Sequence, residues 1–196
     1  KKAAMQKEMD ALNLLYDRQR KQYQIARQNV QIINRKCHEL KVQIADLRRL
    51  QPDEATTRSL DEAEQAARMY DANAATGNEV LDVVLTEKSL LCEAQRIRLN
   101  CVADGTCLAA IEPGDLYALF SNLLDQAIDA AAQQQNDRRM IDLLVCRRQG
   151  FAVINVIGPA LSGSQSDHGR RHSYELKVAR RVVQKYSGTM ATEPRG

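Results

Sequence analysis

Aromatic side chains are scarce in this sequence: tryptophan is absent, and Phe, Trp and Tyr together make up 4% of the 196 residues. Such a chain offers no stacking platform for single-stranded nucleic acid. Charge gives no stronger reason to expect nucleic acid, because 28 basic residues are interspersed with 25 acidic ones, for a formal net charge of +3. Arginine doublets such as Arg138 and Arg139 are typical of a solvated surface, so no nucleic-acid partner is expected.

Two other classes of protein are disfavoured by what the sequence lacks. The five cysteines are odd in number and show no Cys-x-x-Cys spacing, so neither a disulfide framework nor a zinc site is indicated. No apolar run approaches the roughly 18 residues of a membrane span, and no signal peptide is recognisable. The first residue is not Met and lies inside a repeating pattern, which suggests a fragment of a longer protein with room for a membrane segment upstream.

What the sequence does contain is a long seam of mostly apolar residues near its start, spaced alternately four and three residues apart. The seam positions are Met5, Met9, Leu12, Tyr16, Gln19, Tyr23, Ala26, Val30, Ile33, Cys37, Leu40, Ile44 and Leu47. Only Gln19 breaks the apolar series. A strict period of 3.5 residues over about six heptads is typical of a left-handed coiled coil. We therefore predict a helix over 2–50 that pairs with a second copy of the chain or with another long helix, and that ends before Pro52.

The rest of the chain predicts a mixture of helices and strands. A helix over 53–75, joined by a short turn, should lie antiparallel to the first, and two such hairpins would make a four-helix bundle. Further on we predict helices over 79–94, 112–134 and 174–186, strands over 97–102, 140–146, 151–157 and 189–192, and a loop over 158–173. The fold class is therefore α+β, with a dimerisation hairpin over 1–76 and an α/β sandwich over 77–196.

His38 is the first candidate for chemistry. It follows the seam position Cys37, so its imidazole should leave the helix beside the packed face and point towards water. A histidine accepts a phosphoryl group when one ring nitrogen is free and unprotonated while the other is oriented by a hydrogen bond, which Glu39 is placed to supply. The alternative is an ordinary exposed histidine on a coiled-coil face, and without further motifs that alternative would be preferred.

Three motifs together resemble the cytoplasmic part of a sensor histidine kinase of the GHKL superfamily, in the branch of the peptide-sensing quorum receptor kinases. Cys37–Ile44 is similar to that branch's phosphoacceptor box, His-Asp-Leu-Lys-x-Gln. Thr76–Leu85, followed by Lys88, is similar to the junction between the dimerisation helices and the ATPase domain. Ser121–Ala130 resembles the family's asparagine box, Asn-Leu-Leu-Asp-Asn-Ala-Ile-Glu-Ala. Their order and spacing favour the phosphoacceptor hypothesis for His38.

The resemblance implies a dimeric histidine kinase of a two-component system, which phosphorylates His38 from ATP and passes the phosphoryl group to a response regulator. Glu39 would be the orienting acid, and Gln43 would position a water for dephosphorylation of the partner. The resemblance also implies a homodimer, ATP and Mg²⁺ as cofactors, and a cytoplasmic location in a protein that is anchored in the membrane upstream of this fragment.

The nucleotide site that the resemblance implies begins on the helix of the third motif. Asn122 and Gln126 lie one turn apart, so both amides should project from the same side towards Mg²⁺ and phosphate, with Asp129 further along. The chain departs from its family at Gln126, where the family has the asparagine that holds the metal. The extra methylene moves the amide oxygen by more than about 1 Å, which octahedral Mg²⁺ tolerates poorly.

The lid of the nucleotide site departs further from the family pattern. The residues His172, Ser173, Glu175 and Lys177 stand where the family has the glycine-rich sequence His-Gly-x-Gly-Leu-Lys, so both glycines are replaced. Glycines serve such a loop because its backbone N–H groups must approach phosphate closely. The departures keep an alternative open, namely a pseudokinase with a degraded ATP site that acts as a dimeric signalling or docking module.

Overall fold

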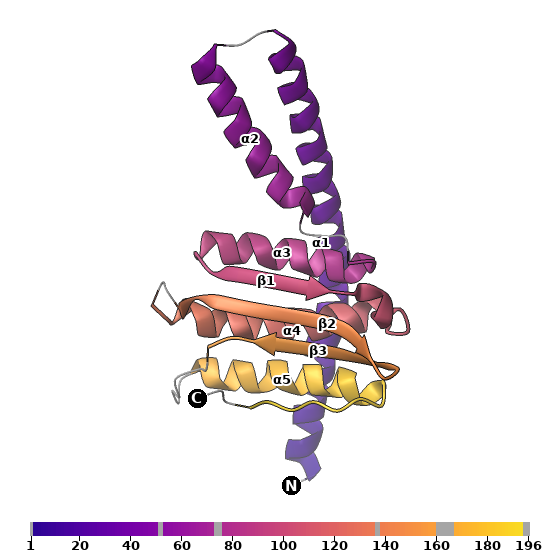
Figure 1. Cartoon of the computed structure of the whole chain (residues 1–196). Coiled ribbons are helices and arrows are strands. Elements are labelled where there is room, and N and C mark those ends of the chain that lie inside the picture. Colours follow the sequence, from indigo (N-terminus) through magenta and orange to yellow (C-terminus); the bar gives the residue numbers. More distant parts are fainter. Residues whose placement is uncertain (1, 51–52, 73–75, 136–137, 160–166, 194–196) are drawn as a thin grey trace.

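The computed structural model describes residues 2–50, 53–72, 76–135, 138–159 and 167–193. Helix α1 (Lys2–Arg49) runs the whole length of the molecule, and α2 (Glu54–Ala72) turns back beside its second half (Figure 1). The start of α2 is fixed by Asp53, whose carboxylate accepts a hydrogen bond from the Thr56 backbone N–H at 2.9 Å. The predicted antiparallel hairpin is therefore present.

Apolar side chains are buried where the two helices of the hairpin meet. Cys37 and Ile44 contribute from α1, and Leu60 and Ala67 contribute from α2. The Arg48 guanidinium spans the same contact, since its Nη2 lies 2.7 Å from the Glu64 carboxylate of α2. The second half of the predicted seam is thus used within one chain, by α2.

The remaining chain forms an α+β unit. It consists of α3 (Glu79–Ala94), β1 (Arg98–Ala103), the 3₁₀ helix η1 (Gly105–Leu108), α4 (Pro113–Ala132), β2 (Met140–Arg148), β3 (Phe151–Ile157) and α5 (Asp167–Lys185). Helix α3 begins where predicted because the Asn78 side chain accepts hydrogen bonds from the backbone N–H groups of Val80 and Leu81. Pro113 occupies the first turn of α4, where its missing N–H costs nothing.

The sheet has the strand order β1-β2-β3, with β1 parallel to β2 and β2 antiparallel to β3. A two-residue turn joins β2 to β3. Both turn residues, Gln149 and Gly150, have positive φ (48° and 85°), as a tight hairpin turn requires. Alternate residues of β2, namely Ile141, Leu143 and Val145, are buried beneath the helices.

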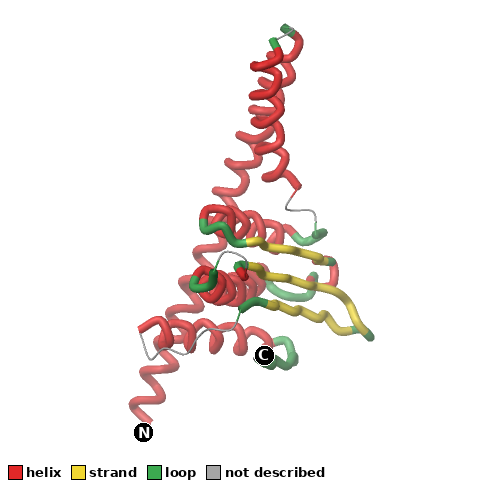
Figure 2. The backbone as a smooth tube through the Cα atoms, turned by 60° about the vertical axis from the view of Figure 1, so that its left-hand side comes forward, coloured by secondary structure: helices red, strands yellow, loops and turns green. Residues whose placement is uncertain are grey.

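Helices α3, α4 and α5 cover one face of this sheet, and α1 lies on the other side of the helix layer (Figure 2). The main core cluster therefore joins residues that are far apart in the sequence. Tyr23, Ala26 and Val30 of α1 belong to it, together with Tyr117 and Phe120 of α4. The middle of the predicted seam is thus buried against the chain's own α+β unit. The dimeric coiled coil stays a prediction.

The predicted α+β fold class is confirmed, while one predicted helix boundary and one predicted strand are wrong. Helix α5 begins at Asp167, inside the stretch 158–173 that was predicted to be a loop. The predicted strand over 189–192 has no regular secondary structure. Predicted helix residues 73–75 lie outside the described residues. No helix in the described part of the chain combines the length and apolarity that a membrane span needs.

Candidate functional site

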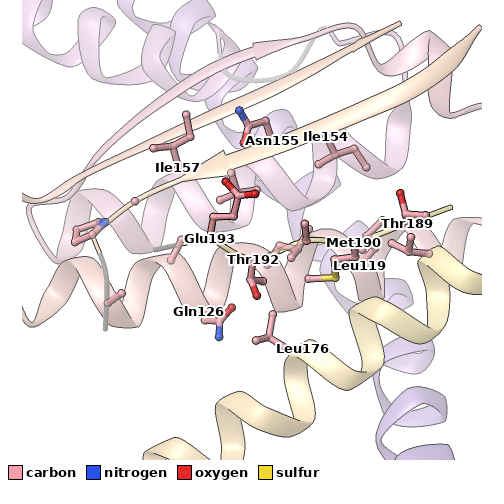
Figure 3. A pocket seen from close by; sticks show the side chains of 18 residues that line it. Leu119, Gln126, Ile154, Asn155, Ile157, Leu176, Thr189, Met190, Thr192 and Glu193 are labelled. Atoms are coloured by element: carbon pink, nitrogen blue, oxygen red, sulfur yellow. The ribbon is translucent and has the colours of Figure 1, made fainter. Parts of the chain in front are cut away.

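A cavity of about 760 Å³ opens between α4, β3, α5 and the stretch Thr189–Glu193 that follows α5. Most of the residues that line it are apolar, among them Leu119, Ile154, Leu176 and Met190, although polar and apolar atoms contribute about equally to its surface (Figure 3). This volume is in the usual range for pockets that bind small molecules or cofactors. A cavity of this size can accept a flat base, provided that a few polar groups fix its orientation.

The polar groups of the cavity come from two segments. Gln126 lies on α4, and Thr192 and Glu193 lie on the stretch after α5 (Figure 3). Asn155 of β3 borders the cavity, but its side chain is exposed and lies on the other face of the strand from Ile154. Amide, hydroxyl and carboxylate oxygens are the ligand types that Mg²⁺ accepts, and amide nitrogens can donate to phosphate or to a base. The donor set therefore fits a nucleotide with its metal.

Sequence reasoning missed Thr192 and Glu193. No signal in the sequence points to them, since residues 189–192 were predicted to be a strand and the place of this stretch beside β3 is a property of the tertiary fold.

Asn122 does not join Gln126 in the cavity, contrary to the prediction that both amides project from one side. The side-chain amides of Asn122 and Gln19 form a reciprocal pair. Asn122 Nδ2 donates to Gln19 Oε1, and Gln19 Nε2 donates to Asn122 Oδ1, each at 2.8 Å. The Asn122 amide also donates to the Ala118 carbonyl at 2.6 Å. Only 2% of Asn122 is exposed. The physical reason is that α1 covers this side of α4, which only the tertiary structure reveals.

Asp129, the remaining predicted site residue of α4, is half-buried and lies outside the cavity lining. Of the four predicted lid residues, Glu175 and Lys177 have described side chains, and neither lines the cavity. Lys177 is exposed, with its Nζ 5.2 Å from the centroid of the Tyr174 ring. His172 and Ser173 lie within α5, and their side chains are outside the described part of the structure. Glu175 is half-buried on the same helix.

A buried ion pair holds α4 in place beside the cavity. Lys88 of α3 is 5% exposed, and its Nζ lies 2.8 Å from the Asp125 carboxylate. Burial alone would lower the pKa of Lys88, but the charges of Asp125 and Glu87 outweigh it, so the pKa is raised and the ammonium form is maintained. Because Asp125 directly precedes Gln126, this pair fixes the turn that carries the cavity amide.

The predicted phosphoacceptor lies on the hairpin, away from the cavity. His38 is exposed, directly after the buried Cys37, as predicted. The Glu39 carboxylate accepts a hydrogen bond from Lys36 Nζ at 2.7 Å, and this bond holds the pKa of Glu39 below its ordinary value. Gln43 is exposed one turn further along. Orientation of the His38 ring by Glu39 therefore stays a prediction.

The cavity and His38 are far apart along α1. Helix α5, which lines the cavity, meets α1 at Tyr16, where the Arg181 guanidinium lies 5.5 Å from the ring centroid. From Tyr16 to His38 the helix rises by about 33 Å, at ~1.5 Å per residue. Figure 1 shows α5 and the α2 hairpin at opposite ends of the molecule.

Comparison with known proteins identifies the unit that contains the cavity. No curated protein matches the chain in sequence. Residues 111–195 match the family model of the GHKL domain. Domains of this kind typically bind ATP with Mg²⁺. The matched residues include α4, β3, Gly158 and Pro159, α5 and the stretch after α5, which together contain every residue that lines the cavity. Residues 111–195 are therefore similar to a GHKL domain and are called the GHKL domain below, and the cavity between α4, β3 and α5 is the candidate nucleotide site of this stretch.

Proposed function

We propose that this protein is a sensor histidine kinase that phosphorylates His38 from ATP and passes the phosphoryl group to an aspartate of a response regulator. The observation that carries the proposal is the combination of a GHKL domain with an exposed histidine on a helical hairpin of the same chain. His38 stands beside the buried Cys37, so the rigid hairpin displays its ring to solvent and to other proteins.

The chemistry requires little from the protein besides positioning and charge stabilisation. An unprotonated ring nitrogen of His38 attacks the γ-phosphorus, a P–N bond forms as the bond to the bridging oxygen breaks, and ADP leaves. The second ring nitrogen keeps its proton, and Glu39 is the nearest acid in sequence that can accept a hydrogen bond from it. Gln43 would position the water that reverses the phosphorylation of the regulator.

The cavity of the GHKL domain would bind the nucleotide. The apolar walls around Leu119 and Ile154 would hold the base. Gln126 and Glu193 are the oxygen donors that would hold Mg²⁺, which neutralises charge on the β- and γ-phosphates when it is bound.

Phosphoryl transfer requires the cavity and His38 to lie close together, which they do not in this structure. The cavity and His38 are separated by tens of ångströms, so either the GHKL domain leaves its place on α1 or the acceptor is the His38 of a second copy. Either route agrees with a homodimer whose upstream segment, anchored in the membrane, moves α1. The upstream signal would then act on α1 before it acts on the nucleotide.

A second function is favoured by the departures from the family pattern. Gln126 stands in place of the metal-binding asparagine, and the lid sequence around Ser173 and Glu175 is helical. Under this alternative the protein is a pseudokinase, which relays signals by dimerisation or by docking a regulator on the hairpin.

One labelling experiment separates these functions. Purified protein is incubated with Mg²⁺ and ATP radiolabelled at the γ-phosphate, and the incorporated label is tested for the acid lability and base stability of a phosphoramidate. We expect label in the unmodified chain and in the control His168→Ala, and none in His38→Ala. Nucleotide-dependent thermal stabilisation without label would instead support the pseudokinase. Label that survives in His38→Ala would refute the assignment of the acceptor.

A further inference from the structure

The face of α1 that packs on the GHKL domain coincides with the predicted coiled-coil seam. Tyr23, Ala26 and Val30 are each less than 9% exposed, and all three are seam positions. Tyr23 meets the ring of Tyr117 on α4, with centroids 5.6 Å apart. A helix face can bury itself against only one partner at a time. The seam residues are therefore unavailable to a second copy of the chain while the domain is docked on them.

Gln19, the single polar residue of the seam, has a specific partner in this docked arrangement. Its amide exchanges two hydrogen bonds of 2.8 Å with Asn122, and both side chains are at least half-buried. In a symmetric coiled coil the same glutamine would instead interrupt the apolar core. The seam thus carries a feature that stabilises docking on the domain and weakens pairing with a second copy.

Charged pairs add to the docked arrangement at the rim of the contact. Arg27 Nε lies 2.7 Å from the Glu79 carboxylate of α3, and Arg20 Nη2 lies 3.6 Å from the Glu112 carboxylate next to α4. The Arg20 side chain also crosses Gly114 closely, because a Cβ at that position would lie 2.7 Å from Arg20 Nε. These contacts select one register of α1 on the domain.

The same seam is only partly covered outside the docked segment. Cys37 and Ile44 are buried against α2, but Met9 before the docked segment, and Leu40 and Leu47 after it, are each 49% exposed. The spacing of 3.5 residues continues through them without interruption. This continuity identifies the second partner of the seam as another helix with the same heptad repeat, which a second copy of α1 supplies.

We propose that the seam of α1 has two mutually exclusive partners, the GHKL domain of its own chain and the α1 helix of a second copy, and that the Gln19–Asn122 pair biases it towards the domain. Displacement of the domain would release the seam for pairing and free the domain to move along the hairpin. The proposal rests on the self-association included in the proposed function. It does not rest on its chemistry, since neither ATP nor His38 takes part.

The test uses substitutions on the surface of the domain that contacts α1. These residues are not part of the seam, so they cannot alter its pairing with a second copy directly. In Asn122→Ala and, separately, Glu79→Lys, docking is weakened while every seam residue is unchanged. Glu93→Lys is the matched control, because it makes the same charge change at the other end of α3, at an exposed position. Sedimentation equilibrium of the full chain measures the dissociation constant of the dimer. We expect Asn122→Ala and Glu79→Lys to lower it by about tenfold or more, and Glu93→Lys to leave it unchanged.

A second series of variants tests the Gln19–Asn122 pair from the side of Gln19, so that the result does not depend on the folding of Asn122→Ala. Gln19→Leu removes the polar interruption and should promote the dimer, whereas Gln24→Leu adds the same side chain at an exposed position of α1 outside the seam and should not. The double variant Gln19→Leu with Asn122→Leu replaces both amides by apolar groups and should restore docking in part, with a weaker dimer than Gln19→Leu alone.

Self-association that is equal in all of these variants, or a chain that remains monomeric throughout, would overturn the proposal. Neither result would bear on phosphorylation of His38, which the labelling experiment measures separately.

Discussion

At the scale of single residues, the buried Lys88 ammonium of α3 holds α4 through its ion pair with Asp125. Replacing Lys88 by Met leaves the partly buried Asp125 carboxylate, whose side chain is 33% exposed, without its counter-ion, which typically costs about 1–3 kcal/mol. We expect urea unfolding to show a loss of this size. The double variant Lys88→Met with Asp125→Leu should recover most of it, because the pair is then replaced by apolar side chains. A loss below about 1 kcal/mol in Lys88→Met would contradict the buried pair.

Cys92, which lies beside this pair, makes stability depend on pH. Burial raises the pKa of its thiol to about 11 from an ordinary value of 9.0. Because the pKa of the folded state is the higher one, the neutral thiol contributes stability that is complete below pH 9 and is lost as the pH rises towards 11. The loss should be about 2–3 kcal/mol. Denaturant unfolding at pH 8, 9, 10 and 11 should show a shallower decline for Cys92→Ala than for the unmodified chain. Parallel declines would contradict the assignment.

Gln126 lines the cavity, but it is a glutamine at the position where the family pattern has an asparagine. Gln126→Asn shortens the amide by one methylene and restores the family's metal ligand in a residue that lines the cavity. We expect calorimetry to give a severalfold lower Kd for Mg-ATP and little change for ATP in the presence of EDTA, because the gain depends on the metal. Equal affinity gains with and without Mg²⁺ would show that the amide acts on the nucleotide alone.

At the scale of elements, α5 shows what the loss of two glycines does. Serine and glutamate tolerate helical geometry better than glycine, so the lid sequence around Ser173 and Glu175 continues as helix. Ser173→Gly with Glu175→Gly should lower helix stability by about 0.5–1 kcal/mol per site and reduce the far-ultraviolet circular dichroism at 222 nm. The control pair Ser173→Ala with Glu175→Ala should retain the signal. An unchanged spectrum in the glycine pair would mean that this turn of α5 is held by tertiary contacts.

The elements that could be predicted from the sequence are those whose boundaries have a local cause. Asn78 caps α3, Pro113 opens α4, and the Gln149–Gly150 turn limits β3, so these elements begin or end where their residues require. The start of α5 was missed because the stretch 158–173, which is rich in glycine, serine and charged residues, was predicted to be a loop. In the candidate site, Gln126 was found by its motif, whereas Glu193 reaches the cavity only through the tertiary fold.

At the scale of the whole molecule, the heptad pattern contained the buried residues Tyr23, Ala26, Val30, Cys37 and Ile44 of α1, but Met9, Leu40 and Leu47 are exposed, and the pattern did not determine the partner of the buried face. A spacing of 3.5 residues reports that one side of a helix is covered, and the covering surface can be another chain, α2 or the GHKL domain. Tyr23 and Val30 face the domain, while Cys37 and Ile44 face α2. The position of Asn122 could not be predicted for the same reason, because its partner Gln19 is more than a hundred residues away.

The shared core makes α1 part of the folding unit of the GHKL domain. Tyr23→Ala removes a ring that is 5% exposed and in contact with Tyr117, so we expect a loss of about 3 kcal/mol in the free energy of unfolding. Ile25→Ala, at a neighbouring position that is 58% exposed, should cost little. Urea unfolding of the full chain measures both. If residues 77–196 were stable without α1, their transition would keep its midpoint in Tyr23→Ala; a midpoint lowered for the whole cooperative transition shows that α1 and the domain unfold together. A signal that displaces α1 would then act directly on the stability of the nucleotide site, through contacts made about 20 Å along the helix from His38, at ~1.5 Å per residue.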